Sequence, residues 1–207
     1  MKRTLILVAI LFSFSLTIEA QNPEFENLKT IDNWLQLNIN NKHISGATIM
    51  VADKHKIIYS KTLGKSNLKT QRDLEENDYF KIASLSKVIT TVAVMKLYED
   101  GYFDLDDPID LYLPIFNEIK IIKHQEGSKN YTLVKASKKI TIRHLLNQTA
   151  GFAYDGPIIS EFYKEKKISF FNPIHKSLAS FMKDLSDMPI IHEPGEKFTY
   201  GPSTDIL

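Results

Sequence analysis

The sequence of 207 residues contains no cysteine, which excludes disulfide bonds, thiolate metal sites and a lipid-modified N-terminal cysteine. It also lacks an excess of charge, since 26 basic and 25 acidic residues leave a net charge of +1. No basic stripe is interleaved with aromatic residues, so nothing indicates a nucleic acid or a charged membrane surface as partner. The six histidines show no metal-ligand spacing. We therefore expect no metal and no organic cofactor.

The one long apolar run lies at the N-terminus and predicts a secretory signal peptide over residues 1–20. Lys2 and Arg3 supply the charged start, residues 5–16 the apolar segment, and Ala20 the small residue at the cleavage site. The alternative is an uncleaved membrane anchor, but the run is short for a membrane span and Glu19 closes it. We therefore predict a periplasmic or secreted bacterial protein with no stable membrane anchor after cleavage.

Hydrophobic periodicity predicts a single domain over residues 21–207 that starts with a helix and a β-hairpin and continues mainly as helices. The polar stretch 64–78 and the lysine-rich stretch 118–139 are expected to be irregular. Two strands make a poor sheet, and residues 203–207 look like the opening of a helix, so we expect further strands beyond this chain. The expected helices cover 24–39, 84–100, a short segment ending near 114, 141–146 and a segment opening at 172–173, and the expected strands cover 46–52 and 57–63.

The most informative motif is Ser84-Leu85-Ser86-Lys87, where an extended stretch passes into a long apolar helix. A serine and a lysine three apart on a helix share one face, and the helix N-terminus favours an oxyanion. This arrangement indicates acyl transfer through a covalent serine ester. The alternative is that Ser84 caps the helix and Lys87 is a surface residue. Two other Ser-x-x-Lys matches, at 66–69 and 180–183, lie in a polar turn and in an amphipathic helix, where no chemistry is indicated.

Tyr200 is the candidate partner of this pair. Rigid Pro-Gly and Gly-Pro turns on both sides hold it, and a fixed phenol can relay a proton to a leaving group. Its alternative role is packing on the core. For Lys87 to accept a proton it must be neutral, which requires its pKa to fall from about 10.4 to about 7–8. Other routes are disfavoured, since the sequence has no Gly-x-Ser-x-Gly elbow, no phosphate loop and no His-Glu-x-x-His.

Four ordered segments, residues 80–87, 97–114, 140–151 and 194–200, together resemble the serine β-lactamase and penicillin-binding-protein superfamily. They are most similar to its class C-like branch, which also holds carboxylesterases and D-amino-acid peptidases. The resemblance implies an α/β fold of the α+β type, with an antiparallel sheet flanked by helices and a helical subdomain. It also implies catalytic roles: Ser84 as nucleophile, Lys87 as its proton acceptor and Tyr200 as the second acid–base residue.

Two departures from the family pattern bear on function. The second motif is typically Tyr-x-Asn, and here it reads Tyr200-Gly201-Pro202. Proline has no amide to hold a substrate carbonyl, which favours ester hydrolysis over β-lactam or peptide recognition. The third motif, on a later strand that lends one oxyanion donor, does not follow Tyr200. Loss of one such donor costs about 10²–10³ in rate, so we expect this chain alone to be inactive or nearly so.

The sequence therefore predicts an exported serine hydrolase that acts on an ester or amide through an acyl-serine intermediate, of the esterase, β-lactamase or D-amino-acid peptidase type. The expected partner is a small-molecule or peptide substrate. The alternative is a catalytically degenerate relative that binds cell-wall peptide or acts as a sensor.

Overall fold

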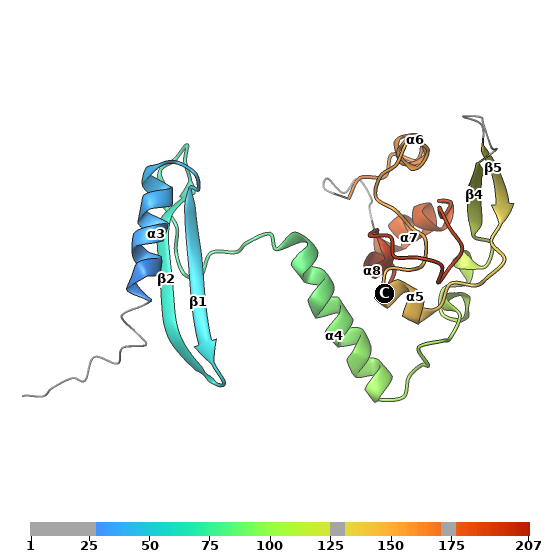
Figure 1. Ribbon diagram of the computed structural model, residues 1–207, viewed down its shortest axis with the longest axis horizontal. Coiled ribbons are helices and arrows are strands. Elements are labelled where there is room, and N and C mark those ends of the chain that lie inside the picture. The colour runs from blue at the N-terminus through green and yellow to red at the C-terminus, as the bar shows by residue number, and fades with distance from the viewer. Residues whose placement is uncertain (1–27, 125–130, 171–176) are drawn as a thin grey trace, which may run out of the picture. The chain divides into compact units, whose positions relative to one another are not determined.

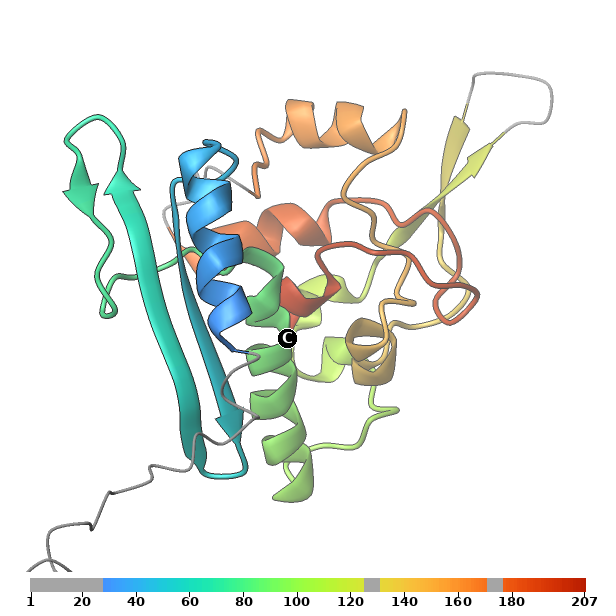
Figure 2. The same ribbon diagram turned by 60° about the vertical axis from the view of Figure 1, so that its left-hand side comes forward.

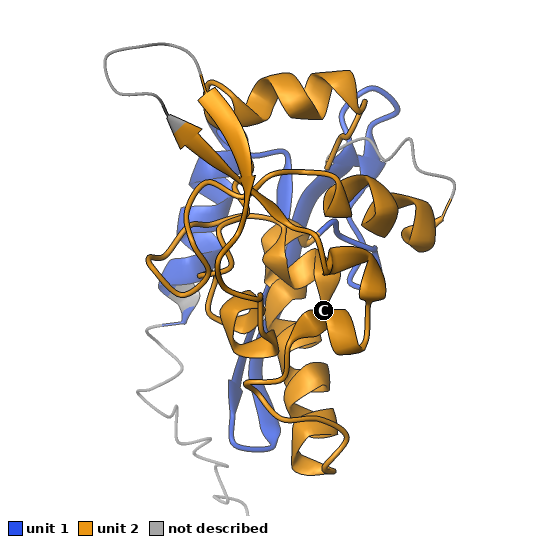
Figure 3. Cartoon of the chain, turned by 90° about the vertical axis from the view of Figure 1, so that its right-hand side faces the viewer, with its two compact units in different colours: residues 1–81 blue, residues 82–207 orange. Residues whose placement is uncertain are grey.

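The computed structural model describes residues 28–124, 131–170 and 177–207. It divides the chain into two compact units, residues 1–81 and residues 82–207 (Figure 3). The signal peptide predicted over residues 1–20 lies outside the described residues. Within the described ranges, no helix has the length and apolar character needed to cross a membrane.

The first unit is a helix packed on an antiparallel sheet. Helix α3 (Lys29–Asn40) lies along the hairpin of β1 (Gly46–Asp53) and β2 (Lys56–Asn67), as Figures 1 and 2 show. The hairpin register pairs Gly46 with Gly64 and Asp53 with Lys56, and a two-residue strand β3 (Arg72–Asp73) adds to the outer edge of β2. The prediction of a helix followed by a hairpin is confirmed. The prediction of an irregular stretch over 64–78 is wrong at its start, because β2 continues to Asn67 and β3 follows.

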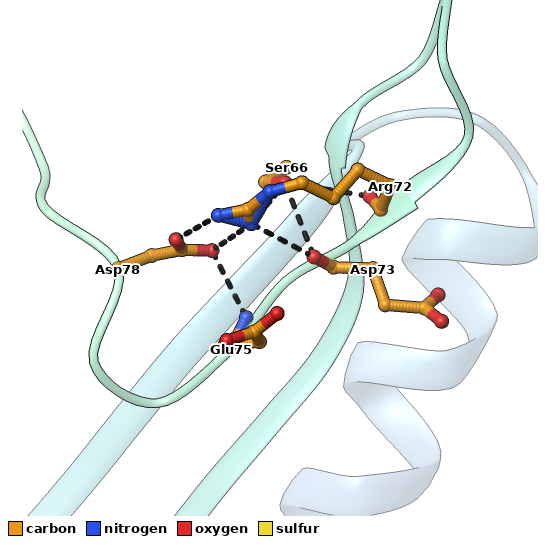
Figure 4. Close-up of polar contacts among 5 residues, drawn as sticks. All are labelled: Ser66, Arg72, Asp73, Glu75 and Asp78. Carbon is orange, nitrogen blue, oxygen red and sulfur yellow. Dashed lines mark hydrogen bonds and ion pairs between the residues drawn. The ribbon is translucent and has the colours of Figure 1, made fainter.

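A polar network holds the turn after β3 (Figure 4). The guanidinium of Arg72 donates from two nitrogens to the carboxylate of Asp78, and one of them also donates to Ser66 Oγ at 3.0 Å. The same carboxylate accepts the backbone N–H of Glu75 at 3.0 Å, and Ser66 Oγ donates to the carbonyl of Asp73 at 3.1 Å. Ser66 therefore lies near the end of strand β2, and its predicted placement in a polar turn is wrong, because the strand continues to Asn67.

The second unit begins with the 3₁₀ turn η1 (Ala83–Leu85), which leads directly into α4 (Ser86–Glu99). Gly101 follows α4 with φ +78°, so it ends the helix as predicted. The remaining elements of this unit are η2 (Ile109–Leu111), η3 (Pro114–Phe116), β4 (Lys120–His124), β5 (Tyr131–Lys135), α5 (Ile142–Leu146), α6 (Ile159–Glu165), α7 (Leu178–Ser186) and α8 (Ser203–Ile206).

The core of the second unit explains where the sequence prediction failed. Strand β4 pairs with β5, and its Ile121 and Ile122 are buried while lysines lie on either side of them. The backbone of Ile190 extends this pairing, with bonds of 2.8 and 2.9 Å to Lys120 and from Ile122. The prediction of an irregular excursion over 118–139 is therefore wrong, because β4 and β5 lie within it and pair with each other.

Two helices also differ from expectation. Helix α6 was not predicted. Helix α7 starts at Leu178 with the side chain of Ser177 as its N-cap, and the start predicted at residues 172–173 lies outside the described residues. Helix α5 follows its prediction closely: the Thr141 hydroxyl accepts from the backbone N–H of His144, and the Thr141 N–H donates back to His144 Nδ1 at 3.2 Å.

Candidate active site

Ser84 occupies the middle of η1, immediately before the first turn of α4. Leu85 is the N-cap of α4 and no side chain caps the helix, so the interpretation of Ser84 as a helix cap is wrong. Ala83 has φ +45°, a left-handed conformation that is costly for a residue with a Cβ. Lys87 follows three residues later and is partly buried. Because it does not cap α4, the Ser84 hydroxyl remains available to another partner.

The structure brings the three predicted residues together. Tyr200 Oη donates a hydrogen bond of 2.7 Å to Ser84 Oγ. Lys87 Nζ lies 5.2 Å from the centre of the Tyr200 ring and 5.5 Å from that of Tyr154. The two rings meet edge-on with their centres 5.6 Å apart. A serine hydroxyl, a phenol and an amine therefore share one pocket, although they come from residues as far as 116 positions apart.

Tyr154 and Asp205 belong to the same arrangement, and the sequence did not single them out. Lys87 Nζ donates to Tyr154 Oη at 3.2 Å, and that hydroxyl donates to Asp205 Oδ2, also at 3.2 Å. The Tyr154 ring is braced by Phe170, whose ring centre lies 4.7 Å away. Tyr154 follows Gly151 in a run with buried Phe152, and nothing local distinguishes it from a core aromatic. Asp205 lies in the first turn of a helix, where acidic residues are common, so its position in the sequence did not distinguish it.

The contacts of Lys87 favour its charged, protonated form. Burial lowers the pKa of Lys87, but its contacts with Tyr154, Tyr200 and Asp205 outweigh that effect, so its pKa is raised overall. This direction is opposite to the lowered pKa that a neutral Lys87 requires. As a phenolate, Tyr200 can accept a hydrogen bond from the Ser84 hydroxyl, and this bond, together with the nearby Lys87 charge, lowers the pKa of Tyr200 despite its partial desolvation. Burial raises the pKa of Tyr154, so that residue stays a neutral phenol.

A cavity of about 780 Å³ surrounds these groups. Its wall is largely apolar and aromatic, with Tyr154, Phe170 and Leu178 among its members. Its ionisable lining residues include one lysine, Lys87, and two carboxylates, Asp155 and Asp205. Among the described residues, no cluster of three or more histidine, aspartate or glutamate side chains is placed to hold a metal ion.

Comparison with known proteins places this geometry in a family. A family model described as Beta-lactamase matches residues 27–207. The chain belongs to the Beta-lactamase family. The resemblance seen in the sequence to serine β-lactamases and penicillin-binding proteins is thereby confirmed, and the helices and antiparallel sheets are those of part of this α+β fold.

Relatives of this Beta-lactamase family chain include acyl-transferring proteins. It is 33% identical over 149 residues to "Acyltransferase calJ" of Penicillium decumbens, covering 72% of this chain and 35% of that protein. Among solved structures, it is similar to "EstCE1, a hydrolase with promiscuous acyltransferase activity", with a TM-score of 0.71 and 25% identity over 86% of this chain and 44% of that one. The simvastatin synthase LovD of Aspergillus terreus shares the fold, with a TM-score of 0.68, 24% identity, and coverage of 86% and 45%. The chain thus spans less than half the length of the relatives it matches.

The departure from the usual Tyr-x-Asn motif has a structural counterpart in this Beta-lactamase family chain. Pro202 is fully buried and forms the N-cap of α8, so its ring contributes no polar group to the cavity. The next polar side chain of this segment that lines the cavity is that of Thr204, which is itself mostly buried.

Proposed function

We propose that this chain carries the nucleophile and the acid–base groups of a serine hydrolase that cleaves esters through an acyl-Ser84 intermediate. The observation that carries the proposal is the 2.7 Å contact between Tyr200 Oη and Ser84 Oγ, with Lys87 beside the tyrosine ring. The family membership and the esterase and acyltransferase relatives support the same chemistry.

In the proposed reaction Tyr200 acts as phenolate and takes the proton of the Ser84 hydroxyl. Ser84 Oγ then forms a bond to the carbonyl carbon, and the bond from that carbon to the leaving oxygen breaks as Tyr200 returns the proton to it. Water, deprotonated by Tyr200 in the same way, releases the acid and restores Ser84. Lys87 remains an ammonium ion and stabilises the phenolate. The raised pKa of Lys87 and the lowered pKa of Tyr200 support this assignment, which moves the proton acceptor from Lys87 to Tyr200.

The proposed substrates are neutral esters with an apolar acyl or alcohol part. Penicillins and D-alanyl peptides carry a carboxylate, and two carboxylates, Asp155 and Asp205, line the cavity against the single charge of Lys87. Pro202 in place of the amide-bearing residue further favours esters. The names of calJ and EstCE1 describe acyl transfer by those proteins and support this choice.

The test is covalent labelling of the longest reading frame that contains this sequence. A fluorophosphonate should add one mass adduct at Ser84, and a nitrophenyl ester should turn over faster than nitrocefin. Ser84→Ala should abolish both labelling and turnover. Ser180→Ala is the matched control, because Ser180 belongs to another Ser-x-x-Lys match and lies exposed on α7. Absence of any adduct at Ser84 would refute a hydrolase and favour a degenerate binding protein.

We also propose that the protein is exported by its first 20 residues. The supporting feature is the charged and then apolar N-terminal run that ends at Ala20. N-terminal sequencing of the protein from a periplasmic extract should find Gln21 first, and a protein that still begins at Met1 would contradict export by cleavage.

A further inference from the structure

Gln148 is a buried polar residue outside the cavity, placed between α5 and the Gly151 turn. Only 7% of its surface is exposed, and its backbone is left-handed with φ +59°. Apart from its backbone N–H, its hydrogen-bonding groups are the backbone carbonyl, Oε1 and Nε2, and all three bond to residues within 199–204. Its carbonyl accepts the N–H of Thr199 at 2.8 Å, its Oε1 accepts the N–H of Gly201 at 3.0 Å, and its Nε2 donates to Thr204 Oγ1 at 2.9 Å.

These three partners bracket Tyr200. Two are the backbone N–H groups of Thr199 and Gly201, immediately before and after Tyr200. The third is the hydroxyl of Thr204, four residues after Tyr200. Tyr200 itself is 46% exposed, so its contacts with the Tyr154 ring and with Lys87 cover only part of its ring. The position of its hydroxyl therefore depends on how firmly its backbone is held. Gln148 holds that backbone on both sides, from a position in the chain more than fifty residues earlier.

Neighbouring contacts keep the same two segments in register. The N–H of Gly195 donates to the carbonyl of Thr149 at 2.9 Å, and the N–H of Ile191 donates to that of Gly151 at 2.9 Å. His192 Nε2 lies 2.8 Å from the hydroxyl of Thr199. The segment that leads to Tyr200 is thus aligned along residues 148–151. Within that run, the side chain of Gln148 also bonds to residues that follow Tyr200.

We propose that Gln148 is a positioning residue that sets the distance between the Tyr200 hydroxyl and Ser84. The inference rests on the proposed function for its catalytic consequence. An amide is suited to this task because its oxygen accepts from the Gly201 N–H while its nitrogen donates to the Thr204 hydroxyl. A buried backbone N–H left without its acceptor would also drive local rearrangement.

The test compares Gln148→Met, which keeps the length but removes the amide, with Gln148→Glu, which keeps the acceptor for Gly201. Gln148→Met should lower kcat by about 10²-fold for esters of poor leaving groups, since a misplacement near 1 Å costs about that much. The loss should be smaller for nitrophenyl esters, which need less protonation, and KM should change little. Gln148→Glu should retain more activity. Thr204→Val removes one bond only and gives a milder variant should Gln148→Met fold poorly.

A second readout does not require turnover. With ring-labelled tyrosine and Tyr200→Phe for assignment, the Tyr200 resonance reports its pKa, which should rise toward its ordinary value of about 10 in Gln148→Met. Leu185→Ala is the control for lost stability. It truncates a buried core side chain, so it should lower the melting temperature and leave the pKa of Tyr200 unchanged. The inference is overturned if Gln148→Met melts early and yet keeps both the leaving-group dependence and the Tyr200 pKa. Failure of Ser84 labelling would contradict the proposed function but not the role of Gln148, because the Tyr200 resonance still reports the position of Tyr200.

Discussion

Replacement of Gly151 by alanine should destabilise the second unit by an amount that the structure lets us divide into two parts. Gly151 has φ +94°, and an added Cβ would lie 2.6 Å from the carbonyl oxygen of His192. The left-handed backbone costs a residue with a Cβ about 1–3 kcal/mol. The contact is 0.8 Å shorter than the 3.4 Å at which ordinary contact begins, and its other side is backbone that cannot rotate away. Overpacking of this kind costs about a further 1–3 kcal/mol.

Gly151→Ala should therefore lower the free energy of unfolding by about 2–6 kcal/mol, a large share of the roughly 5–15 kcal/mol typical of a domain. Urea unfolding followed by circular dichroism measures this, and hydrogen exchange should show lost protection of the Ile191 amide, which bonds to the Gly151 carbonyl. Gly101→Ala is the matched control: Gly101 has φ +78° with nothing within 4 Å of an added Cβ, so it reports the backbone cost alone. Equal destabilisation by the two substitutions would refute the contact with His192 as a cause.

Three further predictions follow from the contacts of single side chains. Tyr154→Phe should lower the pKa of Lys87, because it removes a hydrogen bond that raises it; the pH dependence of Lys87 methylation measures this, and an unchanged profile contradicts it. Burial lowers the pKa of His144, so the fold binds its proton less well than the unfolded chain. That contribution to stability is present above about pH 6.5 and is lost as the pH falls below it, and His144→Gln, which can still form a capping box, should lose this part of the pH dependence in melting experiments. Arg72→Ala should cost less than about 1 kcal/mol, and less again in high salt, because its bond to Asp78 is partly exposed; tryptophan fluorescence during urea unfolding reports this, and a larger, salt-independent loss argues against it.

The elements predicted well are those that local patterns determine. The hairpin over residues 46–63 follows from two β-rich runs around a polar turn, and α5 follows from a threonine cap. Strand β4 was missed because Lys120 and Lys123 flank its two buried isoleucines, and charge counts hid that short apolar pair. The pairing with β5 and with the backbone of Ile190 makes this segment a strand, and Ile190 is distant in sequence.

The site divides in the same way. Ser84 and Lys87 could be predicted because a spacing of three on a helix fixes their relation, and Tyr200 followed from the family resemblance. Tyr154 could not, since its bonds to Lys87 and Asp205 span 67 and 51 residues. The protonation states could not be predicted either. Sequence chemistry required a neutral lysine, whereas contacts that exist only in the folded chain raise the pKa of Lys87 and lower that of Tyr200.

Ala83 meets two opposite demands. Its left-handed backbone, with φ +45°, costs about 1–3 kcal/mol, and glycine would adopt the same angle without a steric penalty. Alanine limits the backbone rotation next to Ser84, the proposed nucleophile, whereas glycine would allow more backbone conformations there. Ala83→Gly would therefore exchange the cost of this backbone angle for greater freedom of the chain around Ser84.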